Sequence, residues 1–137
     1  MLNRFIEAQE HIYEDVLEEL SQGRKRSHWM WFIFPQIQGL GISPKAQYFA
    51  IKSKEEAIEY LAHPILGSRL IECCQKLMSI DNSTAFEILG TPDDLKLKSS
   101  MTLFATVSIE VTIFQEVLKK YFKGEKDSRT LSILSEL

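Results

Sequence analysis

The sequence is poor in cysteine, and the two cysteines that it has exclude a disulfide framework. Cys73 and Cys74 are adjacent, a spacing poorly suited to an intrachain bridge, and they lack the pattern of a metal-ligand set. We therefore expect both thiols to be reduced, with at least one of them packed in the core.

The chain is also poor in glycine and proline, and it has no long hydrophobic run. With 6 Gly, 4 Pro and 45% hydrophobic residues, its composition excludes a disordered chain and predicts a single domain over residues 1–137. The longest apolar run covers residues 29–34, whereas a membrane-spanning helix needs about 20 residues. Glu7 and Glu10 lie where a secretory signal is apolar, so we expect a cytoplasmic protein without membrane contact.

Neither sign of charge predominates, and this excludes one class of partner. The chain has 16 Lys and Arg residues against 19 Asp and Glu residues, which gives a net charge of -3. Proteins that bind long nucleic acids need a basic surface to pair with the phosphates. We therefore expect no long nucleic acid as a partner, and the composition leaves the oligomeric state open.

What the sequence does contain is a series of amphipathic stretches with helix-capping residues between them. Apolar residues recur at helical spacing over residues 3–22, 65–80 and 108–122. Residues typical of helix N-termini are Ser43 with Pro44, Ser53 with Glu56, Thr91 with Pro92, and Asp127. The pattern predicts an all-α fold, a single compact domain of six to eight short helices around one core.

Candidate site residues are densest in residues 23–36, called here the 23–36 segment. In this segment a basic cluster is followed by a histidine and then by the apolar run that holds both tryptophans. Its candidate ligand-binding residues are Arg24, Arg26, His28, Trp29, Trp31 and Gln36. Positive charge beside large aromatic faces is what a pocket for a planar or phosphorylated ligand needs.

The same residues also have structural interpretations. Arg24 and Arg26 follow the first predicted helix, where positive charge complements the exposed carbonyl groups. If Ser27 instead caps the next helix, backbone N–H groups and the basic side chains can converge on one anion. The aromatic residues belong mostly to the core, but at helical spacing they cannot all point inward. We therefore expect one tryptophan, Trp29 or Trp31, to line a surface or cleft.

His28 is the candidate catalytic residue. Imidazole exchanges protons near neutral pH and can act as a general acid or base. No motif fixes a serine or cysteine nucleophile beside it, and a lone histidine next to arginines is more often a structural or ligand-contacting residue. Both interpretations of His28 stay open.

The first predicted helix contributes one candidate ligand-binding residue. Gln9 falls on the apolar stripe of this helix, and a buried amide must be paired. Glu7, His11 and Glu14 lie along another side, but their acidic neighbours favour a solvated face, and no second helix offers matching metal ligands. We expect no metal and no cofactor.

The helix predicted after Thr91 contributes three more candidates, namely Lys98, Ser99 and Ser100. A serine hydroxyl inside a helix often bonds back to the preceding turn. Alternatively, one of these serines reaches the same pocket as His28, with Lys96 or Lys98 supplying positive charge.

Four segments carry a resemblance to a bacterial family called domain of unknown function 1810. The segments are residues 23–36, 39–43, 60–70 and 93–104. The resemblance implies a compact, mainly helical fold and implies no activity. Some members of the family are labelled calpastatin, but calpastatins are long disordered inhibitors, and this chain has the composition of a folded core.

Two functional hypotheses follow. In the first, the protein binds a small anionic ligand such as a nucleotide or an ADP-ribose-like molecule, with hydrolysis or transfer of part of it as an extension. The phosphate-binding residues would be Arg24, Arg26 and Lys98, the stacking residue Trp29 or Trp31, and the orienting residues His28, Gln9 and Gln36. In the second, an aromatic and basic surface makes the chain a non-catalytic protein–protein interaction module.

Overall fold

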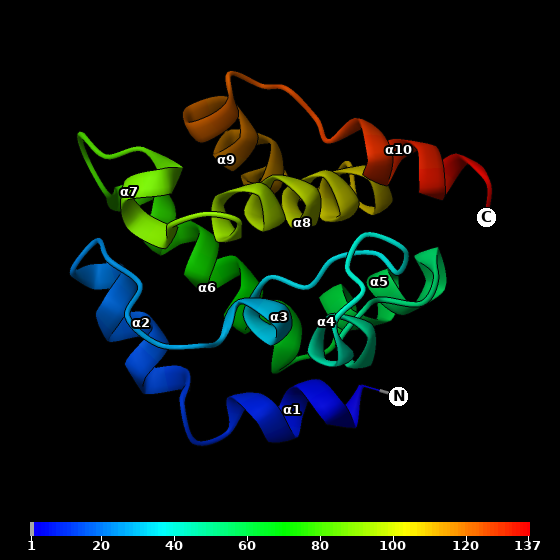
Figure 1. Ribbon diagram of the computed structural model, residues 1–137, viewed down its shortest axis with the longest axis horizontal. Coiled ribbons are helices and arrows are strands. Elements are labelled where there is room, and N and C mark those ends of the chain that lie inside the picture. The colour runs from blue at the N-terminus through cyan, green and yellow to red at the C-terminus, as the bar shows by residue number, and fades with distance from the viewer. Residues whose placement is uncertain (1) are drawn as a thin grey trace.

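The computed structural model describes residues 2–137, and within them the chain forms ten helices (Figure 1). They are α1 (Asn3–Gln9), α2 (Tyr13–Ser21), α3 (Met30–Ile33), α4 (Pro44–Tyr48), α5 (Lys54–Ala62), α6 (Leu66–Ser79), α7 (Ala85–Leu89), α8 (Asp93–Val107), α9 (Ile113–Phe122) and α10 (Ser128–Ser135). The predicted all-α class is confirmed, since the described residues form no strand beyond one isolated bridge. The predicted number of six to eight helices is wrong.

One additional helix arises because a segment with a continuous apolar pattern packs against two different helices. Residues 3–22, predicted as one helix, form α1 and α2 on either side of a turn between Gln9 and Tyr13. Helix α1 packs against α3, whereas α2 packs against α6. Because the two halves bury their apolar sides against different partners, the chain changes direction between them, as Figure 1 shows.

Several helices begin at the predicted capping residues. The caps at Ser43, Ser53 and Asp127 are confirmed, because each side chain accepts a hydrogen bond from a backbone N–H group of its own helix. A complete capping box, in which side chain and backbone bond reciprocally, joins Thr84 and Glu87 at the start of α7.

Two predicted caps are wrong. Thr91 does not cap α8, since the N-cap position belongs to Pro92, which has no side-chain oxygen to accept a hydrogen bond. Ser27 does not cap α3, which begins only at Met30. Its hydroxyl donates instead to the carboxylate of Glu19 on α2.

Helix α8 is the centre of the core. It packs against α5, α7, α9 and α10, and an unbroken stretch of its residues, 99–105, is buried. A helix that is buried around most of its circumference loses the usual contrast between an apolar and a polar face. Both cysteines are free and buried on α6, where burial raises the pKa of Cys73 to about 12. No helix within residues 2–137 is both long and apolar enough to cross a bilayer.

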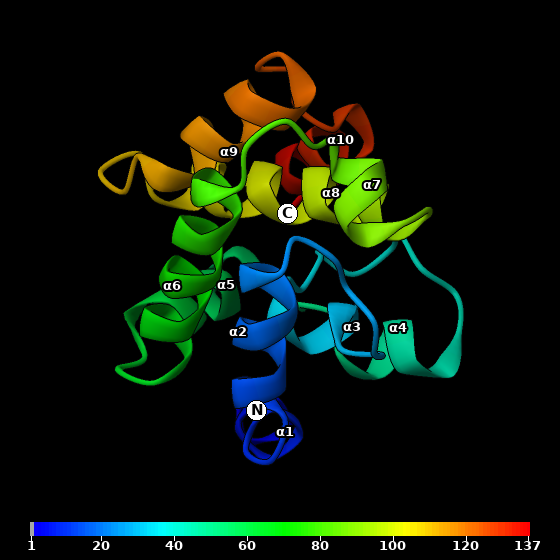
Figure 2. The ribbon, with the colours of Figure 1, turned by 90° about the vertical axis from the view of Figure 1, so that its left-hand side faces the viewer.

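The chain between α3 and α5 brings the end of the 23–36 segment against α8. An isolated parallel bridge pairs Ile37 with Ile51, with Ile51 N donating to Gln36 O and Gln38 N donating to Ile51 O, each at 2.8 Å. Figures 1 and 2 place α3 and α4 on the side of α8 opposite α9. The bridge therefore fixes Gln36 at the edge of the central helix.

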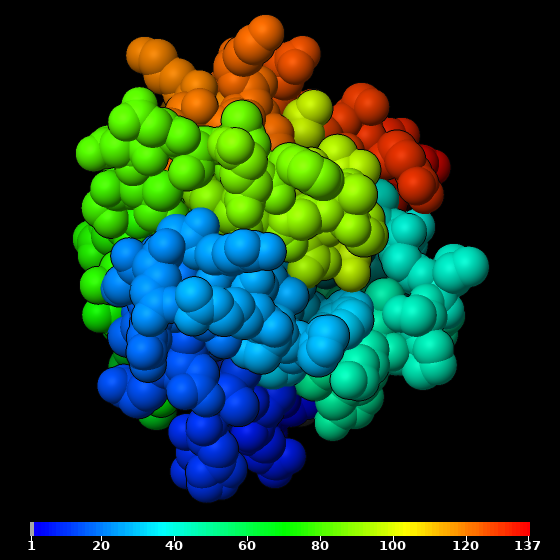
Figure 3. All heavy atoms as spheres, turned by 60° about the vertical axis from the view of Figure 1, so that its left-hand side comes forward, coloured from blue at the N-terminus to red at the C-terminus, as the bar shows by residue number. Residues whose placement is uncertain are grey.

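The N-terminal part of the 23–36 segment lies against α7 and α8. Lys25 N donates to Ile88 O at 2.7 Å, and Lys25 Nζ pairs with Asp93 Oδ2 at 3.0 Å. In Figure 3 the light-blue residues that follow α2 border the yellow-green surface of α7 and α8. The segment is thus held at both of its ends.

Candidate functional site

A cavity of about 470 Å³ opens between the first half of α8, the start of α10 and the chain that follows α3. It is lined by Gln36, Leu40, Gly41, Pro92, Leu95, Lys96, Ser99, Asp127 and Arg129. Its volume lies in the range of about 300 to 1,000 Å³ that small-molecule sites occupy. We refer to it as the α8–α10 cavity.

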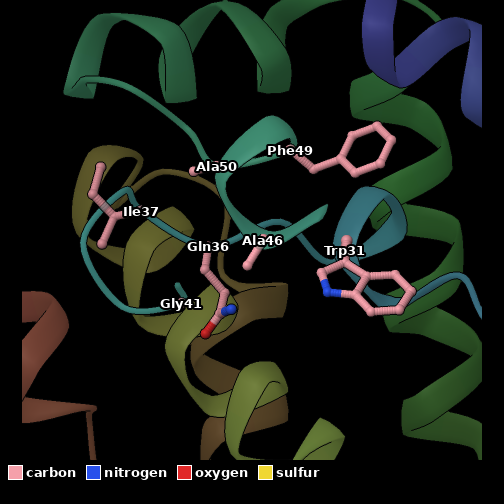
Figure 4. Close-up of a pocket in the computed structure, with 7 residues that line it drawn as sticks. All are labelled: Trp31, Gln36, Ile37, Gly41, Ala46, Phe49 and Ala50. Carbon is pink, nitrogen blue, oxygen red and sulfur yellow. The ribbon is translucent and has the colours of Figure 1, made fainter. Parts of the chain in front are cut away.

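A cleft of only about 10 Å³, enough for about one water molecule, adjoins this cavity and shares two residues with it, Gln36 and Gly41. Figure 4 shows the lining of the cleft: Trp31, Gln36, Ile37, Gly41, Ala46, Phe49 and Ala50. A Cβ atom at position 41 would lie 2.5 Å from the Cβ of Ala46, so only glycine lets the loop approach α4 this closely.

Trp31 holds two positive charges beside the cleft. Its half-buried indole has Lys45 Nζ at 5.0 Å and Lys96 Nζ at 4.9 Å from the ring centroid, one from α4 and one from α8. Cations at this distance are attracted by the electron density on the face of the ring. The indole ring of Trp31 is thus in contact with two ammonium groups and is not free for stacking in this conformation.

Gln36 joins the cavity and the cleft through a free amide. Its backbone carbonyl is fixed by Ile51, but its half-buried side chain makes no hydrogen bond within residues 2–137. In Figure 4 this side chain extends away from Phe49 and Ala50. An amide offers two donors and one acceptor, and those of Gln36 are open to solvent or to a ligand.

The charges that line the α8–α10 cavity leave it with positive character. Lys96 and Arg129 contribute cationic groups, and Arg129 Nη2 donates to Gly39 O at 3.4 Å. The one acidic lining residue, Asp127, directs its carboxylate into the start of α10, where Oδ2 accepts from Thr130 N at 2.9 Å and Thr130 Oγ1 at 2.6 Å. Two cationic residues and one acidic residue therefore line the cavity.

Lys96 also pairs with an acid outside the lining. Its Nζ lies 3.6 Å from Asp93 Oδ1, and the other oxygen of the same carboxylate pairs with Lys25. The Asp93 carboxylate is therefore shared between the 23–36 segment and the cavity.

Three of the candidates predicted from the sequence line these two hollows, namely Trp31, Gln36 and Ser99. Ser99 is buried, and its hydroxyl donates to Leu95 O at 3.2 Å, which leaves the oxygen lone pairs for a further donor. Lys98 is half-buried and does not line the cavity.

The basic and histidine part of the 23–36 segment lies elsewhere. His28 is exposed, lines neither hollow, and has no hydrogen bond or ion pair within the described residues. Arg24 is exposed at a separate hollow beside Phe86 and Gly90. Arg26 donates from Nη1 to the side chain of Gln22, the residue that follows α2. The structure therefore does not bring His28 together with Ser99.

Three further candidates are enclosed in the core. Trp29 has no exposed surface, and its indole N–H donates to Glu19 Oε1 at 2.9 Å. Gln9 is 1% exposed, with Nε2 donating to Phe32 O at 2.7 Å. Ser100 has no exposed surface either. In this conformation packing closes all three to a ligand, which corrects the sequence-based expectation that they contact one.

Sequence reasoning missed Lys45 and Arg129 and ranked Lys98 above Lys96. One local signal favours Lys96, because residues three apart in a helix share a face, and Lys96 stands three before Ser99. Arg129 reaches the cavity only through the packing of α10 on α8, for which no local pattern exists. Among the described residues, no group of three or more His, Cys, Asp or Glu side chains is placed to hold a metal ion.

Comparison with known proteins places the chain among relatives of the same fold. It is similar to the conserved hypothetical protein Rv1873 from Mycobacterium tuberculosis, whose crystal structure matches with a TM-score of 0.96 and 50% sequence identity. The match covers 98% of this chain and 96% of that chain. No curated protein matches at a significant level.

The family model described as "Protein of unknown function (DUF1810)" matches residues 1–134 of the 137 in the chain. That match agrees with the resemblance carried by the 23–36 segment and the start of α8. The chain belongs to the DUF1810 family.

Proposed function

We propose that the protein binds a small anionic ligand, of the nucleotide or ADP-ribose-like class, in the α8–α10 cavity. The observation that carries the proposal is that a cavity of about 470 Å³ is lined by two cationic side chains, Lys96 and Arg129, together with the solvent-accessible amide of Gln36. An unpaired amide beside two cations is suited to a ligand that is polar and negatively charged.

Lys96 and Arg129 would hold the phosphate. An ammonium group acts as a point charge, whereas a guanidinium can pair with two phosphate oxygens at once. Lys45 would add a third positive charge, because Trp31 holds its ammonium group beside the cleft. These local charges matter in a chain whose net charge is -3, since the protein as a whole does not attract anions.

Gln36 would orient the rest of the ligand. Its amide can donate to and accept from the edge of a planar ring or a ribose hydroxyl group. The hydroxyl of Ser99 can accept one further hydrogen bond inside the cavity. The predicted stacking of a ring on Trp31 would require one of the two lysines to leave the indole face.

The proposal covers binding and includes no reaction step. Catalysis by His28, with hydrolysis or transfer of part of the ligand, stays a prediction that its exposed position outside the cavity does not support. Cytoplasmic location and the lack of a long nucleic acid partner also stay predictions.

A thermal-shift screen tests the proposal. Nucleoside phosphates, sugar phosphates, dinucleotides and ADP-ribose are compared on the wild type, Lys96→Ala, Gln36→Ala, His28→Ala and the control Lys119→Ala, which replaces an exposed lysine on α9. A ligand that binds the native state raises its melting temperature by mass action. We expect an increment that is reduced in Lys96→Ala and Gln36→Ala and kept in Lys119→Ala and His28→Ala.

Two results would overturn the proposal. One is that no anionic metabolite shifts the wild type, and the other is that the increment survives both Lys96→Ala and Gln36→Ala. The first would leave the protein–protein interaction module as the better hypothesis.

A further inference from the structure

A second hollow, unrelated to the α8–α10 cavity, lies at the other end of α8. It has a volume of about 230 Å³ and lies between α5 and the last turn of α8. Its lining residues are Ile58, Leu61, Ala62, Val107, Ser108 and Val111. Ser99 and Val107 are eight residues apart on one helix, which at 1.5 Å per residue separates the two hollows by about 12 Å. We refer to this second hollow as the α5–α8 groove.

The α5–α8 groove is apolar and open to solvent. Five of its six lining residues are aliphatic, and Ile58 is 51% exposed. Ile109, which lies in the turn between the lining residues Ser108 and Val111, is 76% exposed. Isolated surface aliphatics are common, but aliphatics gathered at a concave site are typical of protein–protein contacts.

The volume of the groove favours a side chain over a metabolite. Small-molecule sites occupy about 300 to 1,000 Å³ and combine an apolar lining with several polar groups. At about 230 Å³ this groove is smaller, and its single polar lining residue is Ser108. A partner that inserts one or two aliphatic side chains fits these dimensions better than a metabolite does.

The rim of the groove carries more acidic than basic groups. Glu55 and Glu59 stand on α5 beside Ile58 and Ala62 at helical spacing, Glu110 lies in the turn that follows α8, and all three are exposed. The half-buried Lys54, four residues before Ile58, is the one basic residue at the same spacing. The C-terminal ends of α5 and α8 also meet here, at Ala62 and Val107, and the last carbonyl groups of a helix carry partial negative charge. Residues 105–112 contain no Lys or Arg.

From this combination we propose that the α5–α8 groove docks a basic amphipathic helix of a partner protein. Aliphatic side chains on one face of that helix would enter the hollow, and Lys or Arg side chains beside them would pair with Glu55, Glu59 and Glu110. Recognition of an amphipathic helix by an apolar groove is a common mode of peptide binding, and acidic rims add specificity and speed of association. The proposal does not depend on the α8–α10 cavity.

The test uses two synthetic helical peptides with leucines on one face, one with lysines and one with glutamates on the other face. Binding is followed on ¹⁵N-labelled protein by NMR chemical shifts. We expect the lysine peptide to perturb the amides of Ile58, Ala62, Val107 and Val111. We expect the glutamate peptide to bind at least about tenfold more weakly, since exposed charge pairs contribute about 0.2 to 1 kcal/mol each.

Charge reversal distinguishes the effect of the rim glutamates from the effect of the net charge of the chain. In Glu59→Lys/Glu110→Lys the affinity for the lysine peptide should fall about tenfold and its dependence on salt should weaken. The control Glu125→Lys/Glu136→Lys changes the net charge equally at exposed residues outside the groove, and it should bind as the wild type does. Ile58→Ser should weaken binding of the lysine peptide both in the wild type and in Glu59→Lys/Glu110→Lys.

Three outcomes would overturn the proposal. They are equal binding of the two peptides, perturbations outside the groove, and dimerisation of the chain through this face in sedimentation experiments. The last would make a second copy of the chain the occupant of the groove.

Discussion

The indole N–H of Trp29 donates to the carboxylate of Glu19 at 2.9 Å, and both residues are buried. The same carboxylate also accepts from Arg26 N at 2.6 Å, from Ser27 N at 3.1 Å and from the hydroxyl of Ser27. Four donors from three residues between α2 and α3, namely Arg26, Ser27 and Trp29, thus converge on one acid of α2. Glu19 therefore organises the basic part of the 23–36 segment, which the sequence had suggested as a ligand site.

Replacing Glu19 by Gln should lower the free energy of unfolding by about 2 to 3 kcal/mol, because hydrogen bonds to a charged group are lost and an amide N–H₂ faces other donors. Urea denaturation at neutral pH measures the change. Glu18→Gln, at the exposed neighbouring position, should stay within about 0.5 kcal/mol of the wild type. Equal effects of the two variants would contradict the role given to Glu19.

Glu19 should also make stability depend on pH in acid. Burial raises its pKa, but hydrogen bonds from Ser27, Arg26 and Trp29 outweigh burial and lower the pKa from 4.5 to about 2. A carboxyl whose pKa is lower in the folded state stabilises fully above its unfolded value and loses this contribution as the pH falls. The difference in unfolding free energy between wild type and Glu19→Gln should therefore shrink between about pH 5 and pH 2.

The comparison with Glu19→Gln isolates this carboxyl from other acids. Glu56 has a lowered pKa as well, since hydrogen bonds from Arg4 and Lys52 outweigh its burial, and it contributes to acid unfolding in both proteins. A difference between wild type and variant that stays constant over the acid range would show that Glu19 is not the titrating group.

Gln9 should prove to be structural. Besides Phe32 O, its Nε2 donates to Tyr60 Oη at 3.1 Å, and its Oε1 accepts from Arg69 Nη1 at 3.3 Å. Gln9→Met keeps the length of the side chain but leaves a buried carbonyl and a guanidinium without this partner, and it should destabilise by about 1 to 3 kcal/mol. In the thermal-shift screen the increment from any ligand should be unchanged, and its loss would place Gln9 in the site.

Gly67→Ala should be severely destabilising. A Cβ at this position would lie 1.9 Å from Leu61 O and 2.8 Å from the Leu61 carbonyl carbon, so the ends of α5 and α6 would have to separate. Overpacking that displaces the backbone in a packed core costs about 1 to 3 kcal/mol, and we expect the upper end of this range because the clash is with backbone atoms. Urea denaturation compares it with Ser68→Ala, an exposed neighbour that should change stability by less than about 0.5 kcal/mol.

Ser100→Ala should be stabilising. The hydroxyl oxygen of Ser100 is fully buried on α8 and has no hydrogen-bond partner among the described residues. Removing an unsatisfied buried hydroxyl should raise the free energy of unfolding by about 1 kcal/mol. Ser99→Ala, which deletes a hydroxyl bonded to Leu95 O, serves as the matched comparison in the same denaturation experiment. A loss of stability in Ser100→Ala would contradict the expectation.

The fold could be predicted from the sequence where the signals are local. Ser43, Ser53 and Asp127 each satisfy backbone N–H groups within their own helix, so the cap needs no knowledge of the tertiary structure. The break between Gln9 and Tyr13 depends on which helices receive α1 and α2, and periodicity cannot reveal that. Because periodicity does not reveal where a helix is interrupted by packing, the sequence predicted fewer helices than the structure has.

The candidate site was predictable only in part for the same reason. Trp31 and Gln36 could be selected from the sequence because an aromatic residue and an amide close to a basic cluster are suited to binding a ligand. Their neighbours in the cavity, Lys96 and Arg129, come from α8 and α10, which are distant in sequence. His28 shares the chemistry that a site needs, but it is an exposed residue outside that cavity.

The Asp93 carboxylate, held by Lys25 on one side and by Lys96 on the other, acts as a common counter-ion for a loop and a cavity. If the proposed anion binds in the cavity, it would compete with Asp93 for the ammonium group of Lys96. Asp93 would then be left to Lys25 alone. One shared acid would thereby couple occupancy of the cavity to the 23–36 segment.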